Sequence, residues 1–203
     1  MKHFVITIGR QFGSGGRALG HILSEKLGIP FYDKELLLQA AKESGLNPEL
    51  FVNNDERMPK FISTALSYSF GMSPMPWYGG SSSISDDSLY RAQSEFIEQI
   101  ASHGPCIIVG RSSDYVLRHM PNVVNIFLHA SMDDCVRRII ARNESTTPEK
   151  ARKLAERTNK LRANFYNFYT DKRWGHGYDL CFNTSRLPLE KIADLIIAYL
   201  QAL

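Results

Sequence analysis

Glycines and arginines gather near the start of the chain, in residues 9–17, whose sequence is GRQFGSGGR. An apolar run at residues 4–8 precedes this segment, and a helical pattern of apolar residues follows it. A glycine-rich turn that opens a helix can aim several backbone N–H groups at one anion, and the positive end of the helix dipole strengthens the attraction. The segment therefore predicts a strand, a phosphate-binding loop and a helix. The alternative is a plain glycine turn between two core elements.

The loop lacks the lysine of a Walker A motif, which follows the second glycine of that motif and precedes Ser or Thr. If Gly15 is the second glycine, Gly16 stands at the lysine position and Arg17 at the hydroxyl position. Arg10 then stands where the first glycine would be. Because a guanidinium can hold phosphate oxygens in bidentate fashion, Arg17 is the expected substitute cation. No hydroxyl remains at its position for Mg²⁺.

Polar residues also follow each of the other predicted strands. In open parallel sheets, ligands bind beyond the carboxyl ends of the strands, so these residues form one candidate rim. Asp33 and Asp114 are candidate partners of Mg²⁺ or of a substrate hydroxyl, although either carboxylate could instead cap a helix. Arg111 is a candidate for binding a second phosphate. The rim is completed by Gly110, Ser112, Ser113, Ala130, Ser131, Asn183 and Thr184, of which the last two are expected to contact the donor nucleotide.

Basic residues accumulate on two successive predicted helices that are joined by a short polar turn at residues 144–147. The usual cause of such a run is a solvated helix face. Arginines from both helices favour instead a lid at residues 138–162 that closes over a polyphosphate, because phosphoryl transfer depends on positive charge around the transferring group. The basic residues of the two helices are Arg137, Arg138, Arg142, Lys150, Lys153, Arg157, Lys160 and Arg162.

Short apolar runs alternate with helical periodicity over most of the chain, which predicts a single α/β domain with a five-stranded parallel sheet and helices on both faces. The expected strands span residues 4–8, 30–32, 106–109, 123–128 and 178–182. The expected helices span residues 15–27, 34–44, 86–102, 133–143, 148–169 and 188–200. Thr147 followed by Pro148 is a strong helix start, because Thr can cap the helix and Pro suits its first turn.

Residues 53–85 interrupt this alternation with a long irregular connection. Such a connection in a compact domain is usually a functional lid or a disordered segment. Apolar residues between Met58 and Phe70 fall on one helical face, so part of the segment is expected to form a helix docked on the body or on a second subunit. The second case would make the protein a homodimer. Trp77 and Tyr78 either stack on a nucleobase or anchor the loop.

Length and composition indicate one globular domain, since 203 residues with 43% hydrophobic and 22% charged residues suit a single core. The formal net charge of +3 is too small to argue for nucleic acid. No apolar run approaches the ~18 residues of a membrane span, and the short run after residue 3 is too short for a signal peptide. We therefore expect a cytoplasmic protein that binds neither membranes nor nucleic acid. Cys106, Cys135 and Cys181 are expected to be buried, reduced thiols.

Several of these motifs, taken together in this order, resemble the cytidylate kinase-like family, a divergent branch of the nucleoside monophosphate kinases. Each motif alone is weak, whereas the combination is specific and covers nearly the whole chain. The matching motifs are Gly13-Ser14-Gly15-Gly16-Arg17, Phe31-Tyr32-Asp33, Gln93-Ser94-Glu95, Val109-Gly110-Arg111, Ile126-Phe127-Leu128-His129-Ala130, the stretch 157–162 and Tyr178-Asp179-Leu180-Cys181-Phe182-Asn183-Thr184. One departure is Asn159, which stands where the related pattern has Asp.

The resemblance implies a P-loop kinase fold that uses ATP and Mg²⁺ as the phosphoryl donor system and CMP or a related monophosphate as the acceptor. It implies that Asp33 and Arg111 belong to the acceptor site. It also implies that Arg138, Arg157 and Arg162 belong to the lid. The residues that would hold the donor phosphates are Gly13, Ser14, Gly15, Gly16 and Arg17.

Two other classes of function fit the same residues. Loss of the lysine suits a nucleotide-binding regulatory protein that no longer transfers phosphate efficiently. A kinase of another small metabolite, as in the shikimate or dephospho-coenzyme A kinases of similar architecture, is the third possibility. Kinase and regulator differ in whether Arg17 and the lid arginines replace the missing charge.

Overall fold

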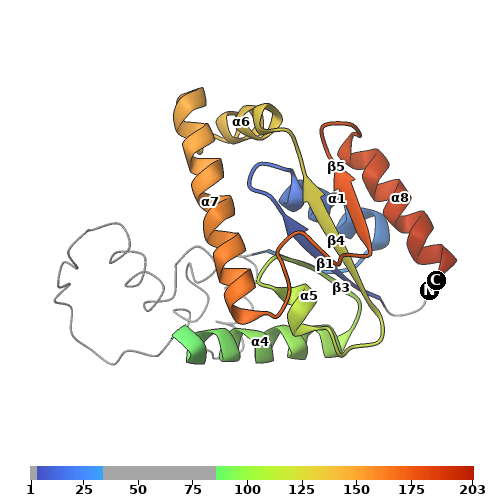
Figure 1. The fold of residues 1–203 in the computed structure, drawn as a ribbon. Coiled ribbons are helices and arrows are strands. Elements are labelled where there is room, and N and C mark those ends of the chain that lie inside the picture. Colours follow the sequence, from blue (N-terminus) through green and yellow to red (C-terminus); the bar gives the residue numbers. More distant parts are fainter. Residues whose placement is uncertain (1–3, 34–85) are drawn as a thin grey trace.

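The computed structural model describes residues 4–33 and 86–203. The expected helix at residues 34–44 lies outside the described residues, as does the expected acceptor-side insertion at residues 53–85 with Trp77 and Tyr78. The described part is an α/β fold in which helices lie on both sides of one sheet (Figure 1). None of its helices is both long enough and apolar enough to cross a membrane.

The sheet has five strands and is parallel throughout, as the apolar runs predict. The strands are β1 (Val5–Arg10), β2 (Phe31–Tyr32), β3 (Cys106–Val109), β4 (Val123–His129) and β5 (Leu180–Asn183). Their order is β2-β3-β1-β4-β5, so β1 lies at the centre and its carboxyl end opens between those of β3 and β4. The central position of β1 therefore brings the glycine loop to the middle of the sheet edge where ligands bind in such folds.

Three strands extend further than the sequence predicts. The pairing of β1 with β4 continues through Gly9 and Arg10, and the pairing of β4 with β5 continues to His129 and Asn183. These residues interrupt the apolar runs, so sequence periodicity places them in loops. Pairing with the neighbouring strand overrides this local signal, and Arg10 becomes the last residue of the central strand.

The helices follow the predicted order. They are α1 (Gly16–Leu27), α4 (Asp86–His103), α5 (Ser113–Val116), α6 (Met132–Ala141), α7 (Pro148–Tyr169) and α8 (Leu189–Ala202). The Thr147 side chain accepts a hydrogen bond from the Lys150 N–H at 3.3 Å, which confirms the predicted start of α7. The four-residue α5 was not predicted, because one turn of helix leaves no periodic pattern.

Alternation along the strands builds one apolar layer on each face of the sheet. Ile6 and Ile8 of β1 pack with α1 and α8, whereas Val5 belongs to the cluster on the opposite face with α4 and α5. A third cluster joins α6 to α7 through Val136, Ile139, Ala151 and Ala155, with Phe12 of the glycine loop packed against it. The α6–α7 hairpin is therefore built directly on the loop that it is expected to cover.

One expectation about the cysteines is wrong. Cys106 and Cys135 are buried as predicted, but Cys181 is exposed. It lies on the edge strand β5, where its neighbours Leu180 and Phe182 face the core cluster of α1 and α8. Because successive side chains of a strand point to opposite faces, Cys181 projects from the other face of the sheet edge.

Candidate active site

The loop between β1 and α1 has the backbone geometry of a phosphate-binding turn. Gly13 and Gly15 have φ values of 82° and 93°, in the left-handed region that strains other residues. A Cβ atom on Gly13 would lie 2.8 Å from the Cβ and the carbonyl oxygen of Cys135, so no side chain fits there. Gly15 is the N-cap residue of α1 and makes no side-chain cap. The first N–H groups of α1 therefore face the loop without a capping side chain, which suits an anion.

Hydrogen bonds to neighbouring elements hold this loop in place. The Gln11 N–H donates to the Leu128 carbonyl oxygen at 2.9 Å, which ties the loop to the end of β4. The Ser14 hydroxyl donates to the Gln11 carbonyl oxygen at 2.8 Å, so this hydroxyl shapes the loop. The loop is thus preorganised by contacts that do not involve a ligand.

Arg138 and Thr184 form a second brace, from α6 and the end of β5. The Arg138 guanidinium donates to the Thr184 hydroxyl at 2.8 Å and to the Thr184 carbonyl oxygen at 2.9 Å. It also donates to the Gly13 carbonyl oxygen at 3.4 Å, and the Thr184 hydroxyl donates to the Ser14 carbonyl oxygen at 2.9 Å. Arg138 therefore lies at the base of the α6–α7 hairpin, against the backbone of the loop.

Arg17 and Asp33 are brought together by α1 and the end of β2. The Arg17 Nε lies 2.8 Å from an Asp33 carboxylate oxygen. The Asp33 side chain is 8% exposed, whereas that of Arg17 is 53% exposed. Since a buried carboxylate is costly unless it is paired, Arg17 compensates the charge of Asp33.

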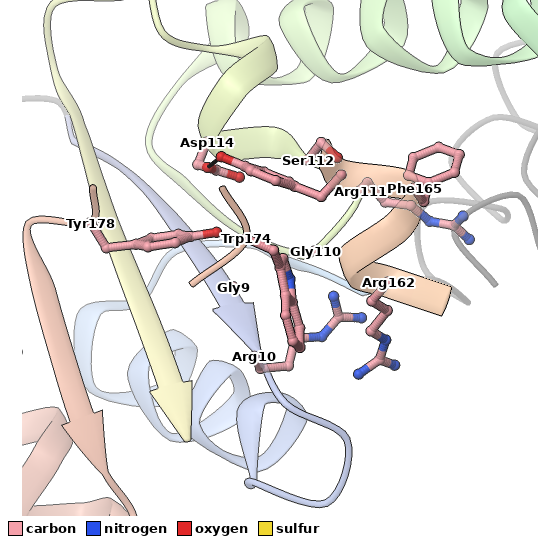
Figure 2. Close-up of a pocket in the computed structure, with 11 residues that line it drawn as sticks. Gly9, Arg10, Gly110, Arg111, Ser112, Asp114, Arg162, Phe165, Trp174 and Tyr178 are labelled. Atoms are coloured by element: carbon pink, nitrogen blue, oxygen red, sulfur yellow. Dashed lines mark hydrogen bonds between the residues drawn. The ribbon is translucent and has the colours of Figure 1, made fainter. Parts of the chain in front are cut away.

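A cavity lies between the ends of β1 and β3 and the inner side of α7 (Figure 2). The cavity itself is narrow, with a volume of about 30 Å³, and the space around it is open to solvent. Three arginines from three elements line it: Arg10 ends β1, Arg111 follows β3, and Arg162 comes from α7. The other lining residues are Gly9, Gly110, Ser112, Asp114, Phe165, Tyr166, Trp174 and Tyr178. The arginines make the cavity a candidate site for an anionic substrate group.

The turn after β3 carries an unusual backbone. Gly110, Arg111 and Ser112 have φ values of 80°, 62° and 51° in succession. Positive φ costs little at glycine but strains the two residues that follow, and such strain concentrates at functional sites. Arg111 is 3% exposed and is among the residues that line the cavity, and Figure 2 shows its guanidinium directed away from those of Arg10 and Arg162.

Asp114 is a half-buried acid held by two tyrosines. The Tyr166 hydroxyl donates to an Asp114 carboxylate oxygen at 2.6 Å, and the Tyr178 hydroxyl interacts with the same carboxylate. Burial raises the pKa of Asp114 above its usual range, and the hydrogen bond from Tyr166 opposes part of this rise. Burial and the nearby Asp114 carboxylate raise the pKa values of Tyr166 and Tyr178 as well. Ser112 is the N-cap residue of α5, so Asp114 does not cap this helix.

The α6–α7 hairpin touches the loop through α7 as well as through Arg138. The Phe12 N–H donates to the side-chain oxygen of Asn159 at 2.7 Å. The Arg162 guanidinium lies 5.3 Å from the centre of the Phe12 ring, within the range of a cation–π contact. Asn159, which departs from the family pattern, thus binds a backbone amide of the loop, where an amide or a carboxylate oxygen can serve equally as acceptor.

The structure brings most of the predicted residues to one edge of the sheet, in two groups. Around the glycine loop lie Arg17, Asp33, Arg138, Thr184 and Asn183, whose side chain accepts from the Ser185 N–H. Around the cavity lie Arg111, Asp114 and Arg162. Arg157 is exposed on α7 and is not among the residues that line this cavity.

Sequence reasoning placed Arg10 on the candidate rim, with the glycine loop after the first strand, but chose Arg17 as the substitute cation. It gave no site role to Tyr166 and Tyr178, since aromatic residues in a helix or before a strand carry no signal of a shared carboxylate. No cluster of three or more His, Cys, Asp or Glu side chains that could hold a metal occurs in residues 4–33 and 86–203.

The sequence as a whole matches a known protein family. A model of the cytidylate kinase-like family matches residues 5–186. The chain belongs to the cytidylate kinase-like family. The matched residues include both the glycine loop and the cavity. Membership supports a kinase-type fold and phosphotransfer in general. No curated protein matches the sequence.

Solved structures agree with this fold. An uncharacterized protein from Eubacterium ventriosum ATCC 27560 is 25% identical, with a TM-score of 0.72 over 98% of this chain and 99% of that one. A shikimate kinase from Bacteroides thetaiotaomicron is 13% identical, with a TM-score of 0.56 over 98% and 99% of the two chains. A gluconokinase from Sinorhizobium meliloti 1021 is 18% identical, with a TM-score of 0.53 over 98% and 92%. The last two likenesses establish a P-loop kinase fold, and the expected fold class is confirmed.

Proposed function

We propose that this protein transfers a phosphoryl group from ATP to a nucleoside monophosphate, with CMP or dCMP as the favoured acceptor. Family membership and the P-loop kinase fold support phosphotransfer. The observation that carries the proposal is the meeting of Arg10, Arg111 and Arg162 in a cavity next to the glycine loop. Phosphoryl transfer requires little covalent chemistry from the protein and depends on positioning and positive charge, which this arrangement offers.

On the donor side, the phosphates of ATP would bind the amides of residues 13–17 at the start of α1. Arg138 and Thr184 would hold the loop in shape through their hydrogen bonds to its carbonyl oxygens. Asn183 lies next to Thr184, at the end of β5. Mg²⁺ would neutralise charge between the donor phosphates. Asp33, the residue after β2, is the candidate ligand, and the described residues add no cluster of three or more His, Cys, Asp or Glu side chains. Arg17 is paired with Asp33 and would hold this carboxylate in position.

On the acceptor side, Arg111 would bind the phosphate of the monophosphate and Asp114 would orient a substrate hydroxyl. Arg162 and the exposed Arg157 belong to α7, which would close over both substrates. A phosphate oxygen that attacks ATP is already anionic, so this reaction needs no strong general base. The arginines therefore account for the main requirement of the reaction.

A kinase of a hydroxylated small metabolite is the second candidate, and Asp114 is the observation that favours it. A hydroxyl acceptor must lose a proton, and a half-buried carboxylate with a raised pKa is suited to receive it. Asp114 lies in the same cavity as Arg111, so an acceptor with both a hydroxyl and an anionic group would also fit.

A coupled ADP-release assay across two acceptor panels separates these functions. The first panel contains the ribonucleoside and deoxyribonucleoside monophosphates, and the second contains shikimate and gluconate. We expect turnover with CMP or dCMP, and an Arg111→Ala substitution should raise the acceptor KM. Lys191→Ala is the matched control, because Lys191 is 72% exposed on α8 and reaches Asp194 only at 3.8 Å. Turnover only with shikimate or gluconate would contradict a nucleotide acceptor and favour the metabolite kinase. ATP binding without any turnover would favour a regulatory protein.

A further inference from the structure

We infer that Arg10, the last residue of β1, supplies the charge that the P-loop lysine supplies in a Walker A motif. The inference rests on the proposed phosphotransfer function and names the residue that would contact the transferring phosphate. In sequence, Arg10 replaces the first glycine of the motif, and Gly16 stands at the lysine position. The sequence alone does not show whether residues 10 and 16 are in contact, whereas the structure places them side by side.

Arg10 and Gly16 share the space in which a lysine side chain would begin. A Cβ atom on Gly16 would lie 2.9 Å from Arg10 Cγ and 3.1 Å from Arg10 Cβ. Gly16 is the first residue of α1 and its backbone is not in the left-handed region, so lack of space is what excludes a side chain there. The two side chains therefore crowd each other, and the stem of Arg10 runs within 3.1 Å of the point where the stem of a lysine at position 16 would start.

The far end of Arg10 reaches the site where the transferring phosphate would lie. Its guanidinium covers Gly110 at the end of β3, and a Cβ atom on Gly110 would overlap it. The side chain lines the cavity with Arg111 and Arg162, and Figure 2 shows the guanidinium groups of Arg10 and Arg162 directed toward the same space. Arg10 thus spans from the glycine loop to the cavity, between the proposed donor and acceptor sites.

Arg17, the cation that sequence reasoning favours, is placed differently. Its Nε lies 2.8 Å from the buried Asp33 carboxylate, and just over half of its side chain is exposed. A guanidinium that compensates a buried carboxylate has less charge to offer a phosphate. We therefore assign Arg17 to positioning Asp33, and Arg10 to the phosphates.

The test compares Arg10→Ala, Arg10→Lys and Arg17→Ala with the parent protein and with Lys191→Ala. Calorimetry measures Mg·ATP binding, and the coupled assay measures turnover with the accepted substrate. Arg10→Ala should lower turnover by roughly 10² or more, the loss seen when one preorganised electrostatic contact is removed. Arg10→Lys should recover part of it, while Lys191→Ala should match the parent. Circular dichroism and thermal unfolding check that each variant folds.

An exchange of positions gives the sharper result. The double substitution Arg10→Gly with Gly16→Lys should recover turnover lost in Arg10→Gly, because emptying position 10 frees the space for a lysine at position 16. Gly16→Lys alone should disturb the loop, since the two side chains then collide. Full turnover in Arg10→Ala together with loss in Arg17→Ala would overturn the inference and leave the kinase function standing. A parent protein that binds no Mg·ATP would overturn both.

Discussion

The hydrogen bond from Tyr166 to Asp114 should make stability depend on pH in a defined way. Tyr166→Phe removes only the hydroxyl of a buried tyrosine, which donates to the half-buried Asp114 carboxylate at 2.6 Å. A hydrogen bond to a charged group contributes about 1.5–3 kcal/mol, so we expect a loss of about 2 kcal/mol near neutral pH. For a domain of this size that corresponds to a fall in Tm of about 4–8 °C.

The sign of the pH effect follows from the pKa of Asp114, which burial raises. An acid whose pKa is higher in the folded state stabilises the fold below its unfolded pKa and loses that contribution as pH rises through its folded pKa. Removing Tyr166 takes away a donor that opposes the rise, so the pKa of Asp114 should rise further. The destabilisation should therefore be larger at about pH 8 than at about pH 5.

Urea denaturation followed by circular dichroism at both pH values measures these free energies of unfolding. Tyr199→Phe is the matched control, because Tyr199 packs beside the core cluster of α1 and α8 and lies outside the Asp114 network. Equal losses for Tyr166→Phe and Tyr199→Phe, or a loss that does not change with pH, would refute the account of Asp114 as a carboxylate with a raised pKa that Tyr166 stabilises.

Three further outcomes are expected. Gly15→Val should abolish Mg·ATP binding in calorimetry, because φ at Gly15 is 93° and a Cβ atom there would approach Leu189 within 3.2 Å; unchanged affinity would remove the loop from the site. Hydrogen exchange across residues 138–162 should slow when a bisubstrate analogue binds, since the hairpin would close over it, whereas equal exchange in both states would argue against a lid. In the native protein, iodoacetamide should alkylate exposed Cys181 and spare Cys135 and Cys106, because burial raises the pKa of Cys106 to about 12; mass spectrometry of the labelled peptides checks this order.

Some of this architecture could be predicted from short stretches of sequence. The apolar run at the start, the glycine turn and the helix after it were predicted within two residues at each end, because periodicity and turn chemistry act between near neighbours. Thr147 and Pro148 marked the start of α7 for the same reason. The parallel sheet followed from the alternation of strands and helices, which permits little else. The predicted start of α8 was wrong by one residue, because Pro188 is the N-cap residue and the helix begins at Leu189.

The choice among the arginines was decided by tertiary structure alone. Arg138 donates to Thr184, which lies 46 residues further along the chain, and Arg17 is drawn to Asp33 at the end of another strand. Arg10 packs against Gly16, the first residue of α1, and against Gly110, the residue after β3. A guanidinium is long and can reach many acceptors, so its partner is set by which elements pack around it. Local sequence determined that a glycine loop would open α1, and the packing of distant elements determined which arginines lie near this loop.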